Sequence, residues 1–268
     1  MRLLRFIKGR IRSLRAAYER NALRSSNPIS SVKPEDFASS IAEPTSYYKR
    51  AFQDFHHLLP SELREHRLFF QAEGRGFGED AFHTMWWRLV RHFRPESFLE
   101  IGVYRGQTLS LVSLLARMQG LDCTVTGISP FSAAGDSVSS YLRGLDYKAD
   151  TLSNFAHFGL PVPELLEAYS SDHEAVSLIQ SKTWDIIYID GNHDYEVVKA
   201  DWATCSKAVK PGGLVILDDS GLFTSYHPPA FATGGHPGPS RLAFEIRPEH
   251  FREILQVGHN RVFQKPSA

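Results

Sequence analysis

The stretch Phe98-Leu-Glu-Ile-Gly-Val-Tyr-Arg-Gly-Gln107 decides how the rest of the chain is interpreted. A short apolar run ends at two glycines, Gly102 and Gly106, and an apolar segment with helical spacing follows. Glycines let a backbone turn sharply and approach a ligand, and a helix start offers unpaired N–H groups. The spacing is Glu-x-Gly-x-x-x-Gly, so the closest glycine of the dinucleotide fingerprint is missing. Taken alone, the stretch fits a ligand-binding turn and a plain strand-to-helix turn equally well.

Apolar runs and helical patterns alternate from Glu96 onward. The predicted strands are 98–102, 123–128, 165–169, 184–190 and 214–217, and the predicted helices are 108–119, 151–158, 172–181 and 195–209. This alternation is typical of a parallel sheet covered on both faces. Two final runs, 251–257 and 261–264, flank the hairpin signal Gly258-His-Asn260. We therefore predict a doubly wound α/β fold with a mostly parallel, Rossmann-like sheet of about seven strands, an antiparallel last hairpin and an N-terminal helical extension.

Composition narrows the class of protein. The chain has 268 residues, of which 42% are hydrophobic, so it can bury a full-sized core. Thirty basic residues balance thirty acidic ones, which gives no reason to propose a nucleic-acid partner. Cys123 and Cys205 fall in apolar patterns, so we predict buried, reduced thiols and a reducing, cytoplasmic compartment. No stretch approaches the roughly 18 to 20 apolar residues of a membrane span.

The first 26 residues depart from this charge balance. Eight basic residues face one acid, Glu19, and Leu3, Ile7, Ile11, Leu14 and Tyr18 form an apolar stripe at helical spacing. A helix that lies on a membrane or docks on a partner has this pattern, and so do a cleaved transit segment and a solvated helix packed on its own domain. Charges interrupt every apolar run, which excludes a secretory signal. Membrane association through residues 1–26 is thus one open alternative.

Three segments are predicted along the chain: the basic helix at 1–26, a linker and helical cap region at 27–68, and the main domain at 69–268. Pro28, Pro34 and Pro44 lie in the linker part, which extends to about Tyr48. A Gly/Pro/His-rich loop is expected from 221 to 239. The segment from Phe82 to Phe93 has the spacing of a core helix or a lid over a substrate.

Acids stand at the ends of two neighbouring predicted strands. Asp190 ends one strand, and Asp218 and Asp219 end the next. Ligands bind beyond the carboxyl ends of parallel strands, and converging carboxylates need a cation or raised pKa values. Oxygen ligands favour Mg²⁺, or less often Mn²⁺ or Ca²⁺, over zinc. His193 follows Asp190 by three residues, where a neutral imidazole can accept a proton from a hydroxyl that the metal orients.

Four segments together resemble the class I S-adenosylmethionine-dependent methyltransferases. They are Glu100-Ile-Gly-Val-Tyr-Arg-Gly106, Tyr169-Ser-Ser-Asp172, Ile189-Asp-Gly-Asn-His-Asp-Tyr195 and Lys210-Pro-Gly-Gly-Leu-Val-Ile-Leu-Asp-Asp219. Within that class the sequence is most similar to metal-dependent O-methyltransferases of macrolide sugars and to the catechol O-methyltransferase group. The resemblance implies S-adenosylmethionine and a divalent cation, with Mg²⁺ as the expected ion, and a small sugar, polyol or phenolic hydroxyl acceptor. The resemblance does not decide the oligomeric state, and a homo-oligomer is one of the open alternatives.

The resemblance also implies roles for individual residues. Glu100, Gly102, Tyr104 and Gly106 belong to the motif that borders the methionine part of the cofactor, and Ser171 and Asp172 would lie near the adenine. Asp190, Asp218 and Asp219 would hold the cation, with Asp190 also beside the cofactor, and His193 would be the general base. A non-catalytic scaffold and a nicotinamide-dependent oxidoreductase are the alternatives, and the acids and the glycine spacing disfavour them.

One position departs from the pattern. Methyltransferases of this class, like dinucleotide-binding proteins, usually carry an acid after the second strand for the ribose hydroxyls. Here Ser129 stands there, and a hydroxyl makes only part of that contact. Either Asp136 from the following insert or another group is expected to take over.

Overall fold

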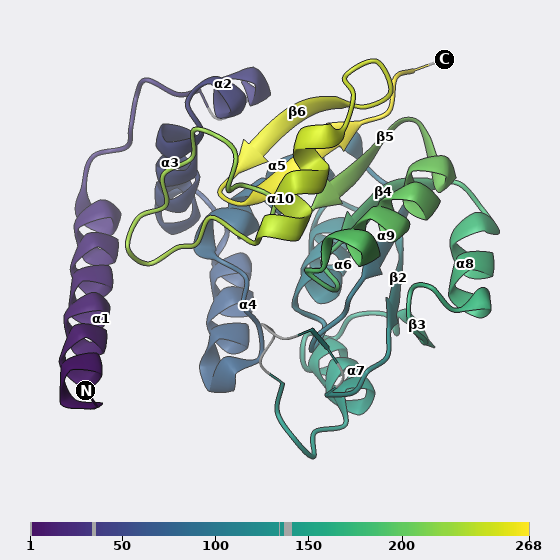
Figure 1. Cartoon of the computed structure of the whole chain (residues 1–268), viewed down its shortest axis with the longest axis horizontal. Coiled ribbons are helices and arrows are strands. Elements are labelled where there is room, and N and C mark those ends of the chain that lie inside the picture. The colour runs from purple at the N-terminus through teal and green to yellow at the C-terminus, as the bar shows by residue number, and fades with distance from the viewer. Residues whose placement is uncertain (1, 34–35, 134, 137–140, 268) are drawn as a thin grey trace.

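Seven strands form one sheet within residues 2–33, 36–133, 135–136 and 141–267, which the computed structural model describes. The strand order is β3-β2-β1-β4-β5-β7-β6. In chain order the strands are β1 Ser97–Ile101, β2 Thr124–Ser129, β3 Glu164–Glu167, β4 Trp184–Ile189, β5 Val209–Leu217, β6 Arg252–Val257 and β7 Asn260–Gln264. The first five pair in parallel and the last hairpin is antiparallel. The predicted fold class and the terminal hairpin are confirmed (Figure 1).

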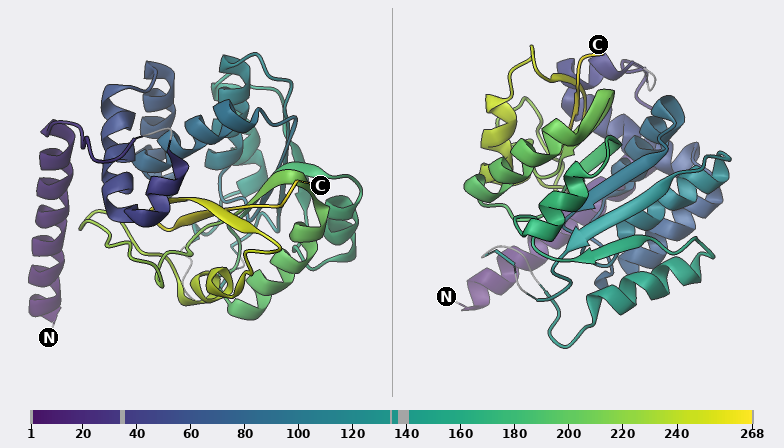
Figure 2. Two further views of the ribbon diagram at one scale, coloured as in Figure 1. Left: turned by 90° about the horizontal axis from the view of Figure 1, so that it is seen from above. Right: turned by 90° about the vertical axis from the view of Figure 1, so that its right-hand side faces the viewer.

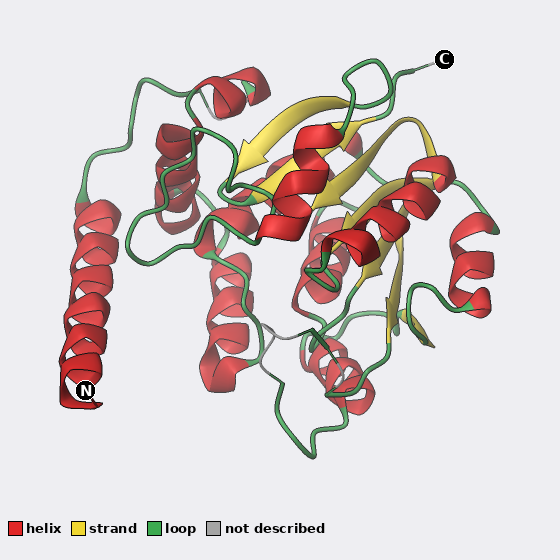
Figure 3. Cartoon of the chain, viewed as in Figure 1, coloured by secondary structure: helices red, strands yellow, loops and turns green. Residues whose placement is uncertain are grey.

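Helices cover both faces of the sheet (Figures 2 and 3). They are α1 Arg2–Ser25, α2 Phe37–Ala42, α3 Pro44–His57, α4 Ser61–Gln71, α5 Asp80–Phe93, α6 Gln107–Met118, α7 Tyr147–His157, α8 His173–Gln180, α9 Tyr195–Ala208 and α10 Pro237–Glu245, with a short 3₁₀ turn at Ala72–Gly74. Alternate strand residues serve the two faces. Ile186 and Tyr188 belong to the cluster with α5 and α6, whereas Ile187 and Ile189 belong to the cluster with α8 and α9.

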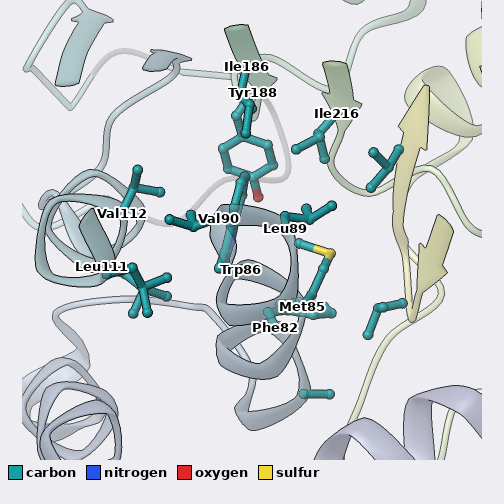
Figure 4. Packing of buried hydrophobic residues seen from close by; sticks show 14 of the residues in the cluster. Phe82, Met85, Trp86, Leu89, Val90, Leu111, Val112, Ile186, Tyr188 and Ile216 are labelled. Atoms are coloured by element: carbon teal, nitrogen blue, oxygen red, sulfur yellow. The ribbon is translucent and has the colours of Figure 1, made fainter. Parts of the chain in front are cut away.

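Helix α5 packs against α3 of the N-terminal region on one side and against the sheet on the other. Its Met85, Trp86, Leu89 and Val90 are buried against β4 and β5 and against α6, which confirms the predicted core helix (Figure 4). The ring of Trp86 meets that of Tyr188 edge to face, with centroids 5.2 Å apart. Truncating such a buried Trp typically costs about 3–5 kcal/mol. This packing fixes α5 as one wall of the space above the strand ends.

Several local predictions were wrong. Residues 37–48, expected in a linker, contain α2 and the start of α3, and both Tyr47 and Tyr48 are buried. Strand β5 follows α9 directly at Val209, so Pro211-Gly-Gly213 lies inside the strand rather than before it. The predicted loop 221–239 ends at His236, because Pro237 provides a first-turn proline for α10. The insert after β2 is described only in part, since residues 134 and 137–140 lie outside the described residues.

Two further findings bear on the predicted class. Cys123 and Cys205 are free thiols, as predicted. Cys205 is buried, whereas the prediction was wrong for Cys123, which is only partly buried. Across the described part of the chain, each helix is too short or too polar to cross a membrane. The division into segments 1–26, 27–68 and 69–268 stays a prediction.

Candidate active site

A cavity of about 560 Å³ opens at the carboxyl ends of the parallel strands. We call it the central cavity. Its lining includes nine of the predicted site residues: Glu100, Gly102, Tyr104, Ser129, Ser171, Asp190, His193, Asp218 and Asp219. Gly106 and Asp172 are outside the lining. Helix α5 supplies the opposite wall through Phe82, His83 and Trp86.

The glycine turn after β1 is built for close backbone approach. Gly102 has a φ of +96°, and a Cβ there would lie 2.1 Å from the carbonyl oxygen of Asp190. Gly106 has a φ of +79° and precedes α6, and a Cβ there would lie 2.6 Å from Cγ2 of Thr151. Only glycine tolerates both the positive φ and this close contact at position 102. The turn therefore brings bare backbone to the cavity, and Gly106 acts by setting the entry into α6.

Glu100 is buried beneath this turn. Burial raises the pKa of its carboxyl to about 8, although the Leu109 N–H of the first turn of α6 favours the charged form. Its Oε2 has no hydrogen-bond partner among the described residues. Unpaired buried oxygens are costly, and a ligand with a donor group would relieve that cost.

The acids after β4 and β5 meet as predicted. Asp190 and Asp218 share a hydrogen bond, and burial together with the charge of Asp218 raises the pKa of Asp190 well above its ordinary value. The neutral Asp190 thus donates to Asp218. A buried imidazole, His259, lies on the other side, with Nε2 3.3 Å from Oδ1 of Asp218. That contact does not meet hydrogen-bond geometry, so Oδ1 of Asp218 has no hydrogen-bond partner among the described residues.

Asp219 lies among three histidines. Its Oδ2 is 2.8 Å from Nε2 of His193 and 3.8 Å from Nε2 of His236, and its Oδ1 is 3.8 Å from Nδ1 of His259. The backbone of Asp219 has a φ of +50°, a left-handed conformation that Asp tolerates better than most residues. This conformation turns the side chain toward the cavity instead of continuing β5.

His193 is held on both ring nitrogens. Nδ1 lies 2.5 Å from Oδ2 of Asp136, which also accepts the backbone N–H of His193 at 2.8 Å. Burial favours the neutral ring, but the hydrogen bonds and charges of Asp219 and Asp136 outweigh it and raise the pKa of His193 to about 9. Asp136, which the sequence offers as a replacement for the missing ribose acid, lines the central cavity, and its Oδ2 is engaged by His193.

Two residues that were predicted to lie near the ribose and the adenine are already hydrogen-bonded to the backbone. The Ser129 hydroxyl donates to the Val103 carbonyl at 2.9 Å, so the backbone already uses it. Asp172 turns away from the central cavity and accepts the Tyr169 N–H at 2.8 Å, because it serves the turn before α8. Ser170 and Ser171 line the cavity beside them.

Sequence reasoning missed three residues of the site, namely His236, His259 and Asp201. His259 is in the β6–β7 hairpin and His236 precedes α10, so only tertiary pairing brings them to Asp219. Asp201 lies on α9, where a polar residue in a helix looks solvent-exposed in the sequence. It is 5% exposed, it lines the central cavity, and its Oδ2 has no hydrogen-bond partner among the described residues. Burial raises its pKa to about 6, with the Ser170 hydroxyl as an opposing hydrogen bond.

The donor set fits both predicted ligands. Asp218, Asp219 and His259 offer ligand atoms within 4.8 Å of one another, and so do His193, Asp219 and His236. Asp190 reaches the first group through its hydrogen bond to Asp218. Glu100, Asp201 and Asp218 each have a carboxylate oxygen that lacks a hydrogen-bond partner within the described part of the chain, and all three residues line one cavity, which suits a polar ligand and a cation together.

Part of the chain is similar in sequence to known proteins. Residues 99–220 match the family described as methyltransferase domain. A curated protein of Acanthamoeba polyphaga mimivirus, itself uncharacterized, is 27% identical over 125 residues. That alignment covers 46% of this chain and 51% of the viral protein, so the chain spans about half the length of this relative.

Three solved structures share the fold. A Staphylococcus aureus protein assigned as a caffeoyl-CoA O-methyltransferase superposes with a TM-score of 0.56 at 16% identity, over 80% of this chain and 96% of that one. A Bacillus cereus O-methyltransferase with bound S-adenosylhomocysteine gives 0.51 at 16% identity, over 79% and 95%. A Streptomyces achromogenes O-methyltransferase of tomaymycin synthesis, bound to S-adenosylmethionine, gives 0.50 at 13% identity, over 88% and 100%. Residues 99–220 are therefore similar to a methyltransferase domain, and the chain shares the fold of these solved O-methyltransferase structures.

Proposed function

We propose that this protein transfers a methyl group from S-adenosylmethionine to a hydroxyl of a sugar, polyol or small phenolic acceptor, with the help of a divalent cation such as Mg²⁺. The observation that carries the proposal is the meeting of His193, Asp218 and Asp219 in the same cavity as the Gly102 turn. A sulfonium methyl donor is already activated, so the enzyme mainly has to deprotonate the alcohol and align the reacting atoms.

The bonds change in one displacement. In the neutral ring the remaining proton is on Nδ1, toward Asp136, and Nε2 of His193 exchanges its contact with Asp219 for the acceptor hydroxyl. The acceptor oxygen loses its proton to this Nε2 and forms a bond to the methyl carbon. The methyl–sulfur bond breaks, and the sulfur of S-adenosylhomocysteine keeps the electron pair. Asp136 fixes the ring of His193 during this step, because it binds both Nδ1 and the backbone N–H.

The cation supplies two effects when bound, orientation of the acceptor oxygen and a lower pKa for its hydroxyl. Asp190, Asp218 and Asp219 are the residues that we expect to hold it, and His259 lies within reach of the same position. A cation also affects His193. Asp219 is one of the two charges that raise the pKa of His193, so a cation held by Asp219 would lower this pKa and favour the neutral imidazole that acts as a base.

The other end of the cavity suits the adenosyl group. It lies at the ends of β2 and β3, where Ser129, Ser170 and Ser171 line it. Adenine presents an exocyclic amine, which is a hydrogen-bond donor, and Asp201 presents a buried acceptor oxygen with no partner among the described residues. We infer that Asp201, rather than the predicted Asp172, accepts this hydrogen bond.

The test is methyl transfer from labelled S-adenosylmethionine to a panel of catechols and glycosides, with EDTA and then with excess Mg²⁺. We expect transfer to vanish with EDTA and to return with Mg²⁺. Asp218→Asn should lower the apparent affinity for Mg²⁺, whereas Asp194→Asn, an exposed acid beside His193, should not. Full turnover in EDTA would contradict the metal, and a product methylated on nitrogen or carbon would contradict O-methyl transfer.

A further inference from the structure

Helix α1 docks on the rest of the chain through only part of its surface. Oε2 of Glu19 accepts the Ala230 N–H at 2.7 Å, and the guanidinium of Arg20 lies 5.2 Å from the centre of the Phe231 ring. Leu23 packs against the core cluster that contains α3. These contacts all come from the C-terminal half of the helix, while the N-terminal half extends beyond the body of the protein (Figures 1 and 2).

The apolar stripe is not the surface that docks. Ile11, Leu14 and Tyr18 are 61%, 71% and 75% exposed. At about 100° per residue, these three side chains fall within roughly 60° of arc, and the docked residues Glu19, Arg20 and Leu23 point about 150° away. The helix therefore turns its apolar stripe outward, which is the reverse of what packing on its own domain requires.

Charge decides what could cover this stripe. Residues 1–26 hold eight basic side chains and one acid, Glu19, whose oxygens pair with Arg15 and the Ala230 N–H. Arg10, Arg12 and Arg15 are exposed on the same stretch as the stripe. Two copies of such a helix would repel each other. A nucleic acid would match the charge, but it offers no apolar medium for Ile11 and Leu14.

An anionic membrane surface satisfies both features. Interfacial helices bury an apolar face at the boundary of headgroups and acyl chains while basic residues meet anionic headgroups. Tyr18 suits that boundary, because one end of its ring is apolar and the other polar. We propose that α1 lies on anionic bilayers through Ile11, Leu14 and Tyr18, with Arg10 and Arg15, which flank this stripe on the helix, toward the headgroups, so that the methyltransferase domain works beside a membrane.

The test uses the full chain and sedimentation with vesicles. Phosphatidylcholine vesicles with and without phosphatidylserine are compared at low and physiological salt. We expect binding only with phosphatidylserine, and weaker binding at higher salt. Ile11→Ser/Leu14→Ser/Tyr18→Ser should lose at least about tenfold in affinity, and so should Arg10→Gln/Arg15→Gln, since each basic residue near an anionic surface contributes a severalfold gain.

The matched control is Val162→Ser/Phe244→Ser, which removes two equally exposed apolar side chains away from α1. It should bind vesicles as the wild type does. The proposal is overturned if the wild type ignores phosphatidylserine vesicles or if the stripe variant binds them unchanged. A dimer that the stripe variant dissociates would assign the stripe to a second copy, and DNA binding that the arginine variant alone abolishes would assign the helix to nucleic acid. Both results would contradict membrane docking.

Discussion

Oδ2 of Asp136 lies 2.5 Å from Nδ1 of His193, and the same oxygen accepts the backbone N–H of His193 at 2.8 Å. One carboxylate thus fixes both the ring and the loop that carries it. Asp136 comes from the insert after β2, whereas His193 follows β4, so the pair joins two segments that are far apart in the sequence.

Replacing Asp136 should change the pH dependence of methyl transfer. Asp136 is one of the groups that raise the pKa of His193, so Asp136→Asn lowers this pKa. A general base works in its neutral form, and activity therefore rises as pH increases through that pKa. The rising limb should shift to lower pH in Asp136→Asn, and maximal turnover should fall roughly 10- to 100-fold because the ring is less well oriented.

Two further variants serve as controls for this measurement. His193→Ala removes the base and should lower turnover by about 10²- to 10⁴-fold, with the affinity for S-adenosylhomocysteine nearly unchanged. Asp194→Asn removes an exposed acid next to His193 and should leave the profile in place. An Asp136→Asn profile that overlays that of the wild type would separate Asp136 from the base.

The glycine turn can be tested with a pair of glycines that share a left-handed φ. At Gly102 a Cβ would lie 2.1 Å from the Asp190 carbonyl oxygen, whereas at Gly120, with a φ of +62°, nothing lies within 4 Å. Gly120→Ala should cost only the backbone strain, about 1–2 kcal/mol of unfolding free energy. Gly102→Ala should cost more and should also lose cofactor affinity, because the turn has to move. Equal effects of the two substitutions on the affinity for S-adenosylhomocysteine would argue against close backbone approach at Gly102.

The role of Asp201 can be read from a donor–acceptor exchange. S-inosylhomocysteine carries an oxygen where S-adenosylhomocysteine carries the adenine amine. The wild type should prefer the adenosyl compound by roughly 10- to 100-fold, the worth of a hydrogen bond to a charged group. Asp201→Asn can donate to the inosine oxygen, so the preference should shrink or reverse. Asp172→Asn, which alters an acid outside the cavity lining, should keep it, and an unchanged preference in Asp201→Asn would contradict the assignment.

The sheet could be predicted because each strand has its own local pattern of apolar residues. Strands such as Trp184–Ile189 are buried on both faces and so appear as continuous apolar runs, and the acids that follow them mark the ligand edge. Helix α10 escaped prediction because it begins at Pro237-Gly-Pro239, where the residues indicate a loop. A proline is favourable in a first helical turn, but the contacts that precede this helix, His236 N–H to the Asp219 carbonyl and the Ser220–Gly235 bridge, are tertiary.

Site residues could be predicted only where they lie at or just after the end of a predicted strand. Asp190, Asp218 and Asp219 come directly after β4 and β5, and His193 lies on the loop that follows β4. His259 reaches Asp218 because β7 pairs with β5, and Asp201 reaches the cavity because α9 turns that side inward. Neither contact leaves a pattern in the sequence. The partner of Asp136 could not be foreseen, since it depends on how the insert after β2 meets the loop after β4.

Binding of S-adenosylhomocysteine, measured by titration calorimetry on the wild type and on Gly102→Ala, tests the central claim that the cavity above β1 and β4 is a methyl-donor site. The account predicts roughly micromolar affinity for the wild type, a clear loss in Gly102→Ala, and no comparable binding of NAD⁺. A folded wild-type protein that fails to bind S-adenosylhomocysteine, or that binds NAD⁺ equally well, would contradict it.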